Sequence, residues 1–388
     1  MPADARKQMA FLTAGFRPFF LFAALSSFAV MLVSGLVYRG FITFAGEFDV
    51  VTWHAHEMLF GYVLAAMAGF LLTAVPNWTG RPAVSGSLLA TLVCLWVIGR
   101  VSLFVSSLVG QWGVLFLVLL FPLVLAALIG REIMAAENRR NLPVVFALLV
   151  FCSAMALVHL DPLLPFSGRD LGLRLGVAVV TCLIALIGGR ITPNFTNNWL
   201  KQRHINALAA PFAALDKLAL AASVLVLLYW VILPEDLICG IAMLSLAGLH
   251  FWRLSRWKGL STVNEPLLLF LHIGYAWLPL GFSLIGVSIL GEGALAYSAG
   301  LHALSSGAMG TMTLVVMSRA ILGHTGRPLI ADQLISASLV LVAVAALMRV
   351  LAGISALPEP IFLMLSVVFW LLSFVLFLVR FSRILVRG

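Results

Sequence analysis

Residues 53–75 read WHAHEMLFGYVLAAMAGFLLTAV, and this stretch decides the fold class. His54, His56 and Glu57 open the segment, and the residues that follow are uncharged and almost all apolar as far as Val75. A helix needs about 20 predominantly apolar residues to cross the hydrocarbon core of a bilayer. The segment therefore predicts a membrane-spanning helix with titratable side chains at one end.

The whole chain has the composition of a membrane protein. Of its 388 residues, 62% are hydrophobic and 10% are charged, whereas soluble domains have roughly 25% charged residues. We predict an all-α, polytopic transmembrane helix bundle that forms one integral membrane domain over residues 1–388. About 12 runs are long enough to span, near residues 17–38, 54–75, 85–107, 112–134, 143–162, 171–192, 213–232, 235–252, 265–290, 298–320, 333–356 and 360–384.

Two features of composition exclude other classes of protein. The net charge of +9 comes from basic residues scattered among short connections, and without a basic stripe or motif it does not indicate nucleic-acid binding. The four cysteines lie in separate apolar runs without a CxxC spacing. This excludes a cysteine-rich iron–sulfur motif and covalent c-type heme attachment.

The distribution of lysine and arginine predicts the orientation of the bundle, because connections on the cytoplasmic side carry an excess of these residues. With a cytoplasmic N-terminus, 19 of the 24 basic residues fall on the inside. The other five are Arg39, Arg100, Arg169, Arg174 and Arg349. We therefore expect both termini in the cytoplasm.

Ionisable residues within membrane spans are costly and usually face a bundle interior or a cavity. By depth, the chain holds two groups of them. The outer group is His54, His56, Glu57 and His302, and the inner group is His250 and His272, with His204, His324 and Arg190 at a similar depth. His159 stands apart near an outer helix end, where a hydrogen bond to another helix is its simplest role.

Helical geometry separates the first two histidines. His54 and Glu57 share a face, and this face continues through the small residues Gly61, Ala65, Ala68 and Gly69. Small residues allow another helix, or a flat cofactor, to approach closely. His56 lies about 200° away from His54 on a regular helix. Either the first turn is irregular, or the two imidazoles serve different partners.

The surroundings of His302 repeat this pattern. Residues 300–310 read GLHALSSGAMG, so small residues surround the imidazole, and imidazole is a common axial ligand of heme iron.

Two further stretches combine arginine, glycine and hydrogen-bonding residues: GGRITPNFTNN at 188–198, with Arg190, and RAILGHTGRP at 319–328, with His324 and Arg327. They either end helices on the basic side or clamp an anion such as a heme propionate.

Several motifs resemble those of the NnrS family, and the similarity covers nearly the whole chain. They are FRPFF at 16–20, WHAHEMLFGY at 53–62, TAVPNWTGR at 73–81, GGRITPNFTN at 188–197, LHIGYAWLPL at 271–280 and LHALSSGAMGTMTLVVMSRAILGHTGRP at 301–328. The resemblance implies a bacterial inner-membrane protein with heme and copper, linked to nitric oxide and denitrification.

With that implication we expect heme b on histidines from at least two helices, including His302 and one of His54 or His56. Copper takes some of the remaining histidines, among them His250, His272 and His324, and Glu57 orients an imidazole as a hydrogen-bond acceptor. Nitric oxide is the expected small-molecule ligand, in protection against nitrosative stress. The alternative is a transporter for a metal ion or another small solute, because paired polar interruptions in many spans are also typical of transporters.

Overall fold

A computed structural model describes residues 10–44, 46, 48–206, 208–291 and 295–387, and the regular elements in these ranges are all helices. Helices suit a membrane because they satisfy every backbone hydrogen bond within one segment. Twelve helical segments of the described chain are long and apolar enough to cross a bilayer, which confirms the predicted fold class and span count. They are Phe16–Tyr38, Val50–Thr79, Gly86–Phe104, Gln111–Ala135, Arg139–Leu163, Gly168–Gln202, Ala214–Ile232, Leu237–Ser255, Pro266–Leu290, Tyr297–His324, Gln333–Leu351 and Glu359–Arg387.

The elements of the first half of the chain are η1 (Ala10–Leu12), α2 (Phe16–Tyr38), α3 (Val50–His56), η2 (Glu57–Val63), α4 (Leu64–Thr79), α5 (Gly86–Phe104), α6 (Ser106–Val109), α7 (Gln111–Ala135), η3 (Arg139–Asn141), α8 (Leu142–Leu160) and η4 (Asp161–Leu163). Those of the second half are α9 (Gly168–Leu183), η5 (Ile184–Gly188), α10 (Gly189–Gln202), α11 (Ala214–Ile232), α12 (Leu237–Ser255), η6 (Gly259–Thr262), α13 (Pro266–Leu290), α14 (Tyr297–His302), η7 (Ala303–Gly310), α15 (Thr311–His324), α16 (Gln333–Leu351) and α17 (Glu359–Arg387).

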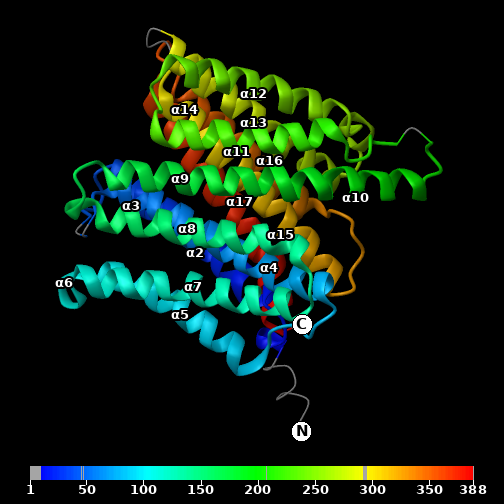
Figure 1. Ribbon diagram of the computed structural model, residues 1–388, viewed down its shortest axis with the longest axis horizontal. Helices are drawn as coiled ribbons and strands as arrows, with labels where there is room; N and C mark the ends of the chain where they lie inside the picture. Colours follow the sequence, from blue (N-terminus) through cyan, green and yellow to red (C-terminus); the bar gives the residue numbers. More distant parts are fainter. Residues whose placement is uncertain (1–9, 45, 47, 207, 292–294, 388) are drawn as a thin grey trace. The chain divides into compact units, whose positions relative to one another are not determined.

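The chain, for which we predict one membrane domain, divides into two compact units. Unit 1 holds Met1–Gly176, Ala320–Arg327 and Phe377–Gly388, and unit 2 holds Val177–Arg319 and Pro328–Leu376. Within unit 1, α7 packs against both α5 and α8, and α2 packs against α4 (Figure 1). Within unit 2, α13 is central, because it packs along α12 and also contacts α14 and η7.

Helix ends differ from the predicted ones where capping or a polar continuation intervenes. The second span begins at Val50, before the predicted residue 54, because the Asp49 side chain accepts hydrogen bonds from the backbone N–H groups of Val51 and Thr52, each at 3.0 Å. Burial acts to raise the pKa of Asp49, but hydrogen bonds from Thr52 and Val51 and the charge of Arg169 together lower it. The sixth span continues to Gln202, past the predicted 192, because α10 extends the helix with polar residues that hydropathy alone does not detect.

Three spans contain a π-helical segment, in which the backbone accommodates an extra residue per turn. These segments are η2, η5 and η7. Two of them begin directly after a histidine of the outer group, His56 or His302. Segments of this kind occur frequently at functional sites.

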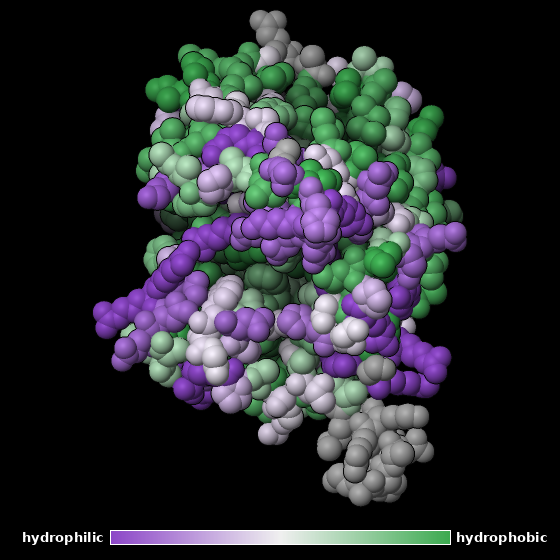
Figure 2. All heavy atoms as spheres, turned by 90° about the vertical axis from the view of Figure 1, so that its right-hand side faces the viewer, coloured by the Kyte–Doolittle hydropathy of each residue, from purple (hydrophilic) through white to green (hydrophobic). Residues whose placement is uncertain are grey.

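Hydrophilic side chains gather at helix ends, as a bilayer requires. Figure 2 shows them on the face that holds the C-terminal end of α10, with hydrophobic side chains on the flanks. The large exposed apolar residues of the spans include Phe116, Leu225 and Val379. This distribution suits a multi-pass protein whose sides face lipid.

The orientation of the bundle gives a first testable prediction. Of two reporters fused to the C-terminus, only the one that is active in the cytoplasm should give a signal. The reason is that the predicted inside connections carry most of the lysine and arginine. The measurement is a paired set of alkaline phosphatase and green fluorescent protein fusions. Phosphatase activity from the C-terminal fusion would contradict either the orientation or the even number of spans.

Candidate functional site

Four buried side chains form a continuous network in unit 1. His56 Nδ1 lies 3.0 Å from Glu57 Oε1, and the same oxygen accepts from Arg100 Nη1 at 2.5 Å. On its other side, His56 Nε2 lies 3.1 Å from Nε2 of His159. His56 is fully buried, and Glu57 is only 3% exposed. The network links the start of the second span to α5 and α8.

The partners fix the tautomers of both imidazoles. Glu57 faces a guanidinium, so its carboxylate is an acceptor and the Nδ1 atom of His56 carries the hydrogen. His56 Nε2 is then an acceptor, and it receives a hydrogen from Nε2 of His159. The remaining nitrogen of His159, Nδ1, therefore presents a lone pair. It is buried, and no described residue offers it a hydrogen-bond partner.

His54 points to a different partner from His56. Its Nδ1 lies 2.9 Å from the Ser34 hydroxyl on α2, and this hydroxyl donates to the carbonyl oxygen of Val30 at 2.8 Å. The hydroxyl oxygen must therefore accept from Nδ1–H of His54, which places the ring lone pair on Nε2. Of the two possibilities that helical geometry leaves open, the structure shows two histidines with different partners.

His302, in unit 2, is held in the same way. Its Nδ1 lies 2.7 Å from the carbonyl oxygen of Ser298, one turn earlier in α14. A carbonyl can only accept, so Nδ1 carries the hydrogen and Nε2 carries the lone pair. The predicted pairing of His302 with His54 or His56 joins residues of different units, and it stays a prediction.

The small residues near these histidines accommodate neighbouring side chains. A Cβ atom at Gly69 would lie 2.6 Å from the Phe20 ring, and one at Gly307 would lie 2.5 Å from the Trp277 ring. Of the two uses of small residues, close approach by another helix is therefore the one visible at these positions.

A second buried network lies in unit 2. Arg253, on α12, donates from Nε to Asp216 at 2.8 Å and from Nη1 to the Tyr275 hydroxyl oxygen at 2.7 Å. The Tyr275 hydroxyl lies 2.9 Å from Nδ1 of His250, and His250 Nε2 lies 2.8 Å from Ser223 Oγ. Because the Ser223 hydroxyl donates to its own helix, His250 Nε2 donates to Ser223 and Nδ1 accepts from Tyr275.

The π-helical segment η5 shapes this second network. Arg253 Nη1 also donates to the carbonyl oxygen of Ala185, within η5, at 2.8 Å. Directly after the segment, a Cβ atom at Gly189 would lie 2.4 Å from Arg253 Nη2. Glycine at this position therefore leaves the room that the buried guanidinium needs.

The two histidines of the inner group do not share a partner. His272 Nε2 lies 2.9 Å from the Thr196 hydroxyl, whereas His250 contacts Tyr275 and Ser223. Trp257 contacts the edge of the Tyr275 ring at 4.4 Å between centroids and lies 6.4 Å from the His272 ring.

The remaining predicted site residues lie apart from these networks. His204 is exposed, with a positive φ of 57°. His324 is exposed at the end of α15, where its ring lies 5.8 Å from that of Phe16. Arg190 belongs to unit 2 and Arg327 to unit 1. No group of three or more His, Cys, Asp or Glu side chains that could hold a metal ion occurs in the chain as far as it is described.

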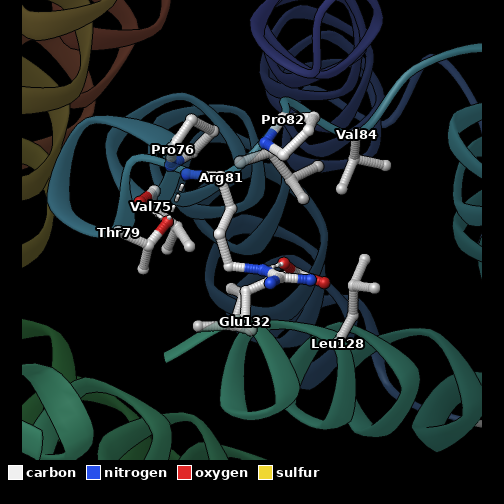
Figure 3. A pocket seen from close by; sticks show the side chains of 10 residues that line it. Val75, Pro76, Thr79, Arg81, Pro82, Val84, Leu128 and Glu132 are labelled. Carbon is white, nitrogen blue, oxygen red and sulfur yellow. Dashed lines mark hydrogen bonds and ion pairs between the residues drawn. The ribbon is translucent and has the colours of Figure 1, made fainter. Parts of the chain in front are cut away.

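A shallow pocket in unit 1 contains one further buried carboxylate. The Arg81 side chain extends across the pocket to Glu132, past Pro76 and Leu128 (Figure 3). Arg131 donates to the other oxygen of Glu132 at 2.7 Å. Because both of its oxygens are ion-paired, this carboxylate has no evident chemical role beyond holding the loop after α4 against α7.

Sequence reasoning missed several members of the networks. By sequence, Arg100 counts among the charges of the outer connections, but it lies within α5 and is 9% exposed. By sequence, Arg253 counts only as one of the basic residues on the inside, yet it forms a buried ion pair with Asp216. An arginine within an apolar run is the signal that finds both networks, because such a charge requires a partner.

Comparison with known families completes the description. No curated protein matches the chain. The model of the family described as NnrS protein matches residues 10–388, which is nearly the whole chain and includes both networks. The chain therefore belongs to the NnrS family, and family membership supports a nitric oxide-related membrane protein.

Proposed function

We propose that this protein binds heme b and copper through intramembrane histidines and protects a bacterial cell against nitric oxide at its inner membrane. The observation that carries the proposal is the shared tautomer of the outer histidines. His54, His56 and His302 each hold Nδ1–H on an acceptor, which makes Nε2 the nitrogen with the lone pair. Metal-ligating histidines almost always use a carboxylate, carbonyl or similar partner in this way.

The histidine nitrogens fit copper and heme b differently. The Nε2 atoms of His56 and His159 face each other, and imidazole suits copper. For both rings to bind one ion, the hydrogen of His159 would move from Nε2 to Nδ1, for which no described residue offers a partner. The two Nε2 atoms lie 3.1 Å apart, a separation that two nitrogen ligands of one ion can have when each metal–nitrogen bond is about 2 Å long. His302 suits heme b, because its ring is oriented by a backbone carbonyl as axial ligands are.

The chain's own residues hold the histidine rings in position and exclude water from them. Glu57 and Arg100 fix the ring of His56, and Ser34 fixes that of His54. Bound iron and copper would supply the affinity for nitric oxide, which is small and uncharged and reaches a buried metal through the bilayer.

Single substitutions test the proposal. His302→Ala should lower heme content, and His56→Ala and His159→Ala should lower copper content in parallel, because each removes one coordinating ring. Pyridine hemochrome assay and elemental analysis of purified protein measure the two groups separately. His204→Asn is the matched control, since this exposed histidine has a positive φ that asparagine tolerates.

The outcomes separate the candidate functions. If His302→Ala, His56→Ala and His159→Ala all retain wild-type heme and copper, these three rings do not hold metal. A purified wild-type protein with no Soret absorbance and no copper would favour the transporter alternative.

A further inference from the structure

Unit 2 contains a group of buried polar atoms for which the described residues offer no hydrogen-bond partner. They lie on three helices and are Thr192 Oγ1, Trp199 Nε1, Glu265 Oε1, His272 Nδ1, Thr311 Oγ1 and Arg319 Nε. Leaving such an atom without a hydrogen bond is energetically unfavourable. Native proteins avoid this cost with ordered water, which bridges buried polar groups.

Three contacts bring together the helices that carry these atoms, and we call the polar rows between them the polar seam. The Thr196 hydroxyl lies 2.9 Å from His272 Nε2, which joins α10 to α13. The guanidinium of Arg319, on α15, stacks 4.4 Å from the centroid of the Phe195 ring on α10. A Cβ atom at Gly274 would lie 2.8 Å from Met312, so α13 and α15 are also in close contact. The three helices therefore pack against one another around the seam.

The seam runs along the helices from one end. Along α10, one face carries Thr192, Thr196 and Trp199, and Arg203 at the C-cap follows four residues after Trp199. Eleven residues of helix extend over about 16 Å. Arg203 is exposed, whereas Thr192 is fully buried.

The other two helices add parallel rows. On α13, Glu265 at the N-cap is followed by His272, about 10 Å further along the axis. On α15, Arg319 lies about 12 Å from the fully buried Thr311. Arg203, Glu265 and Arg319 thus mark one mouth, and Thr192, His272 and Thr311 mark the inner end.

We propose that unit 2 contains a water-filled path that leads from Arg203 and Glu265 into the bundle as far as His272, Thr192 and Thr311, and that this path carries protons. Hydroxyl, imidazole and carboxyl groups joined by water form a chain along which a proton can move, because each can both accept and donate a hydrogen. The path does not depend on any bound metal. The mouth lies on the side rich in lysine and arginine, which we predict to be cytoplasmic.

Glu265 suits the mouth of a proton path. It lies outside the spans, and burial raises its pKa against the opposing charges of Arg319 and Arg203. A carboxyl group with a raised pKa is partly protonated closer to neutral pH, so it exchanges protons with the medium more readily than an ordinary glutamate.

Radiolytic footprinting of the full chain in lipid nanodiscs tests for the water. Bound water generates hydroxyl radicals under X-rays, and mass spectrometry then measures oxidation of nearby side chains. His272 should be oxidised several-fold faster than Trp230, because radicals form only where water lies next to the side chain. Trp199 is partly exposed and reports the mouth of the path. Trp230 is the internal control, since it is fully buried and its indole N–H donates to Tyr297 at 2.6 Å.

Two threonines on the same helix provide matched variants. Thr311→Val removes a hydroxyl that lacks a described partner, so it should slow the oxidation of His272 several-fold. Thr313→Val removes a hydroxyl that donates to the carbonyl oxygen of Met309 at 2.7 Å, so it should leave the rate unchanged. Equal rates for His272 and Trp230 in the wild-type protein would show a dry seam and overturn the proposal.

Exchange of the indole N–H hydrogens with D2O, followed by NMR, tests whether protons move along the path. The Trp199 signal should disappear within minutes, and the Trp230 signal should persist for hours, with Trp199→Phe identifying the resonance. Fast oxidation combined with slow exchange at Trp199 would show water without proton movement and would refute the transport part of the proposal.

Discussion

Replacing Glu57 with leucine should lower the free energy of unfolding by about 3–5 kcal/mol, which is the cost of leaving a buried charge without its partner. Glu57 is 3% exposed and accepts from both Arg100 and His56. The variant leaves the Arg100 guanidinium inside unit 1 with no carboxylate, and it removes the acceptor that orients the His56 ring. Equilibrium unfolding in detergent micelles measures the effect.

The double variant Glu57→Leu with Arg100→Leu is the control. Replacement of a whole buried ion pair by apolar residues is often neutral, so the double variant should recover most of the lost stability. If the double variant is instead as unstable as the sum of the two single variants, the residues do not act as a pair, and the network described for unit 1 is incorrect.

The second large effect is expected at the ion pair of unit 2. Asp216→Asn should lower the free energy of unfolding by about 3 kcal/mol, because Arg253 is fully buried and loses its counter-charge. In the native protein the backbone N–H of Ala213 donates to Asp216 Oδ2 at 2.9 Å. The side-chain oxygen of asparagine can still accept this hydrogen bond. The loss therefore reports the charge and not the helix cap.

Asp236→Asn is the matched control for this variant. Asp236 caps α12 in the same unit, where it accepts from the N–H of Ile238 at 2.8 Å. Asparagine caps helices as well as aspartate does, so a change of less than about 0.5 kcal/mol is expected. Similar losses from both variants would mean that capping, and not the buried arginine, accounts for the effect.

The sequence alone is sufficient for the number of spans and for the span in which each buried histidine lies. Both follow from hydropathy and from a fixed rise per residue, which are local properties. It was less successful at the helix ends, because the N-cap at Asp49 and the polar continuation of α10 do not alter the apolar runs.

The pairing of side chains was beyond the sequence. That His56 meets His159, and that His250 meets Tyr275, depends on which helices are neighbours and how each is rotated. His159 was expected to be a hydrogen-bond partner of another helix, and it is, but its partner could not be named. The interruptions at η2, η5 and η7 make such rotations harder to infer, because they break the regular period on which a helical wheel relies.

These π-helical segments have a consequence for mutations that change the length of the chain. Each π-helical segment contains one residue more than a regular α-helix would need over the same length. Deleting one residue there would restore the regular α-helical period. Deletion of Ser306, within η7, would rotate His302 by about 100° relative to α15 while leaving every histidine in the chain. Along these spans the length of the segment, as much as the identity of its residues, sets the direction in which an imidazole points.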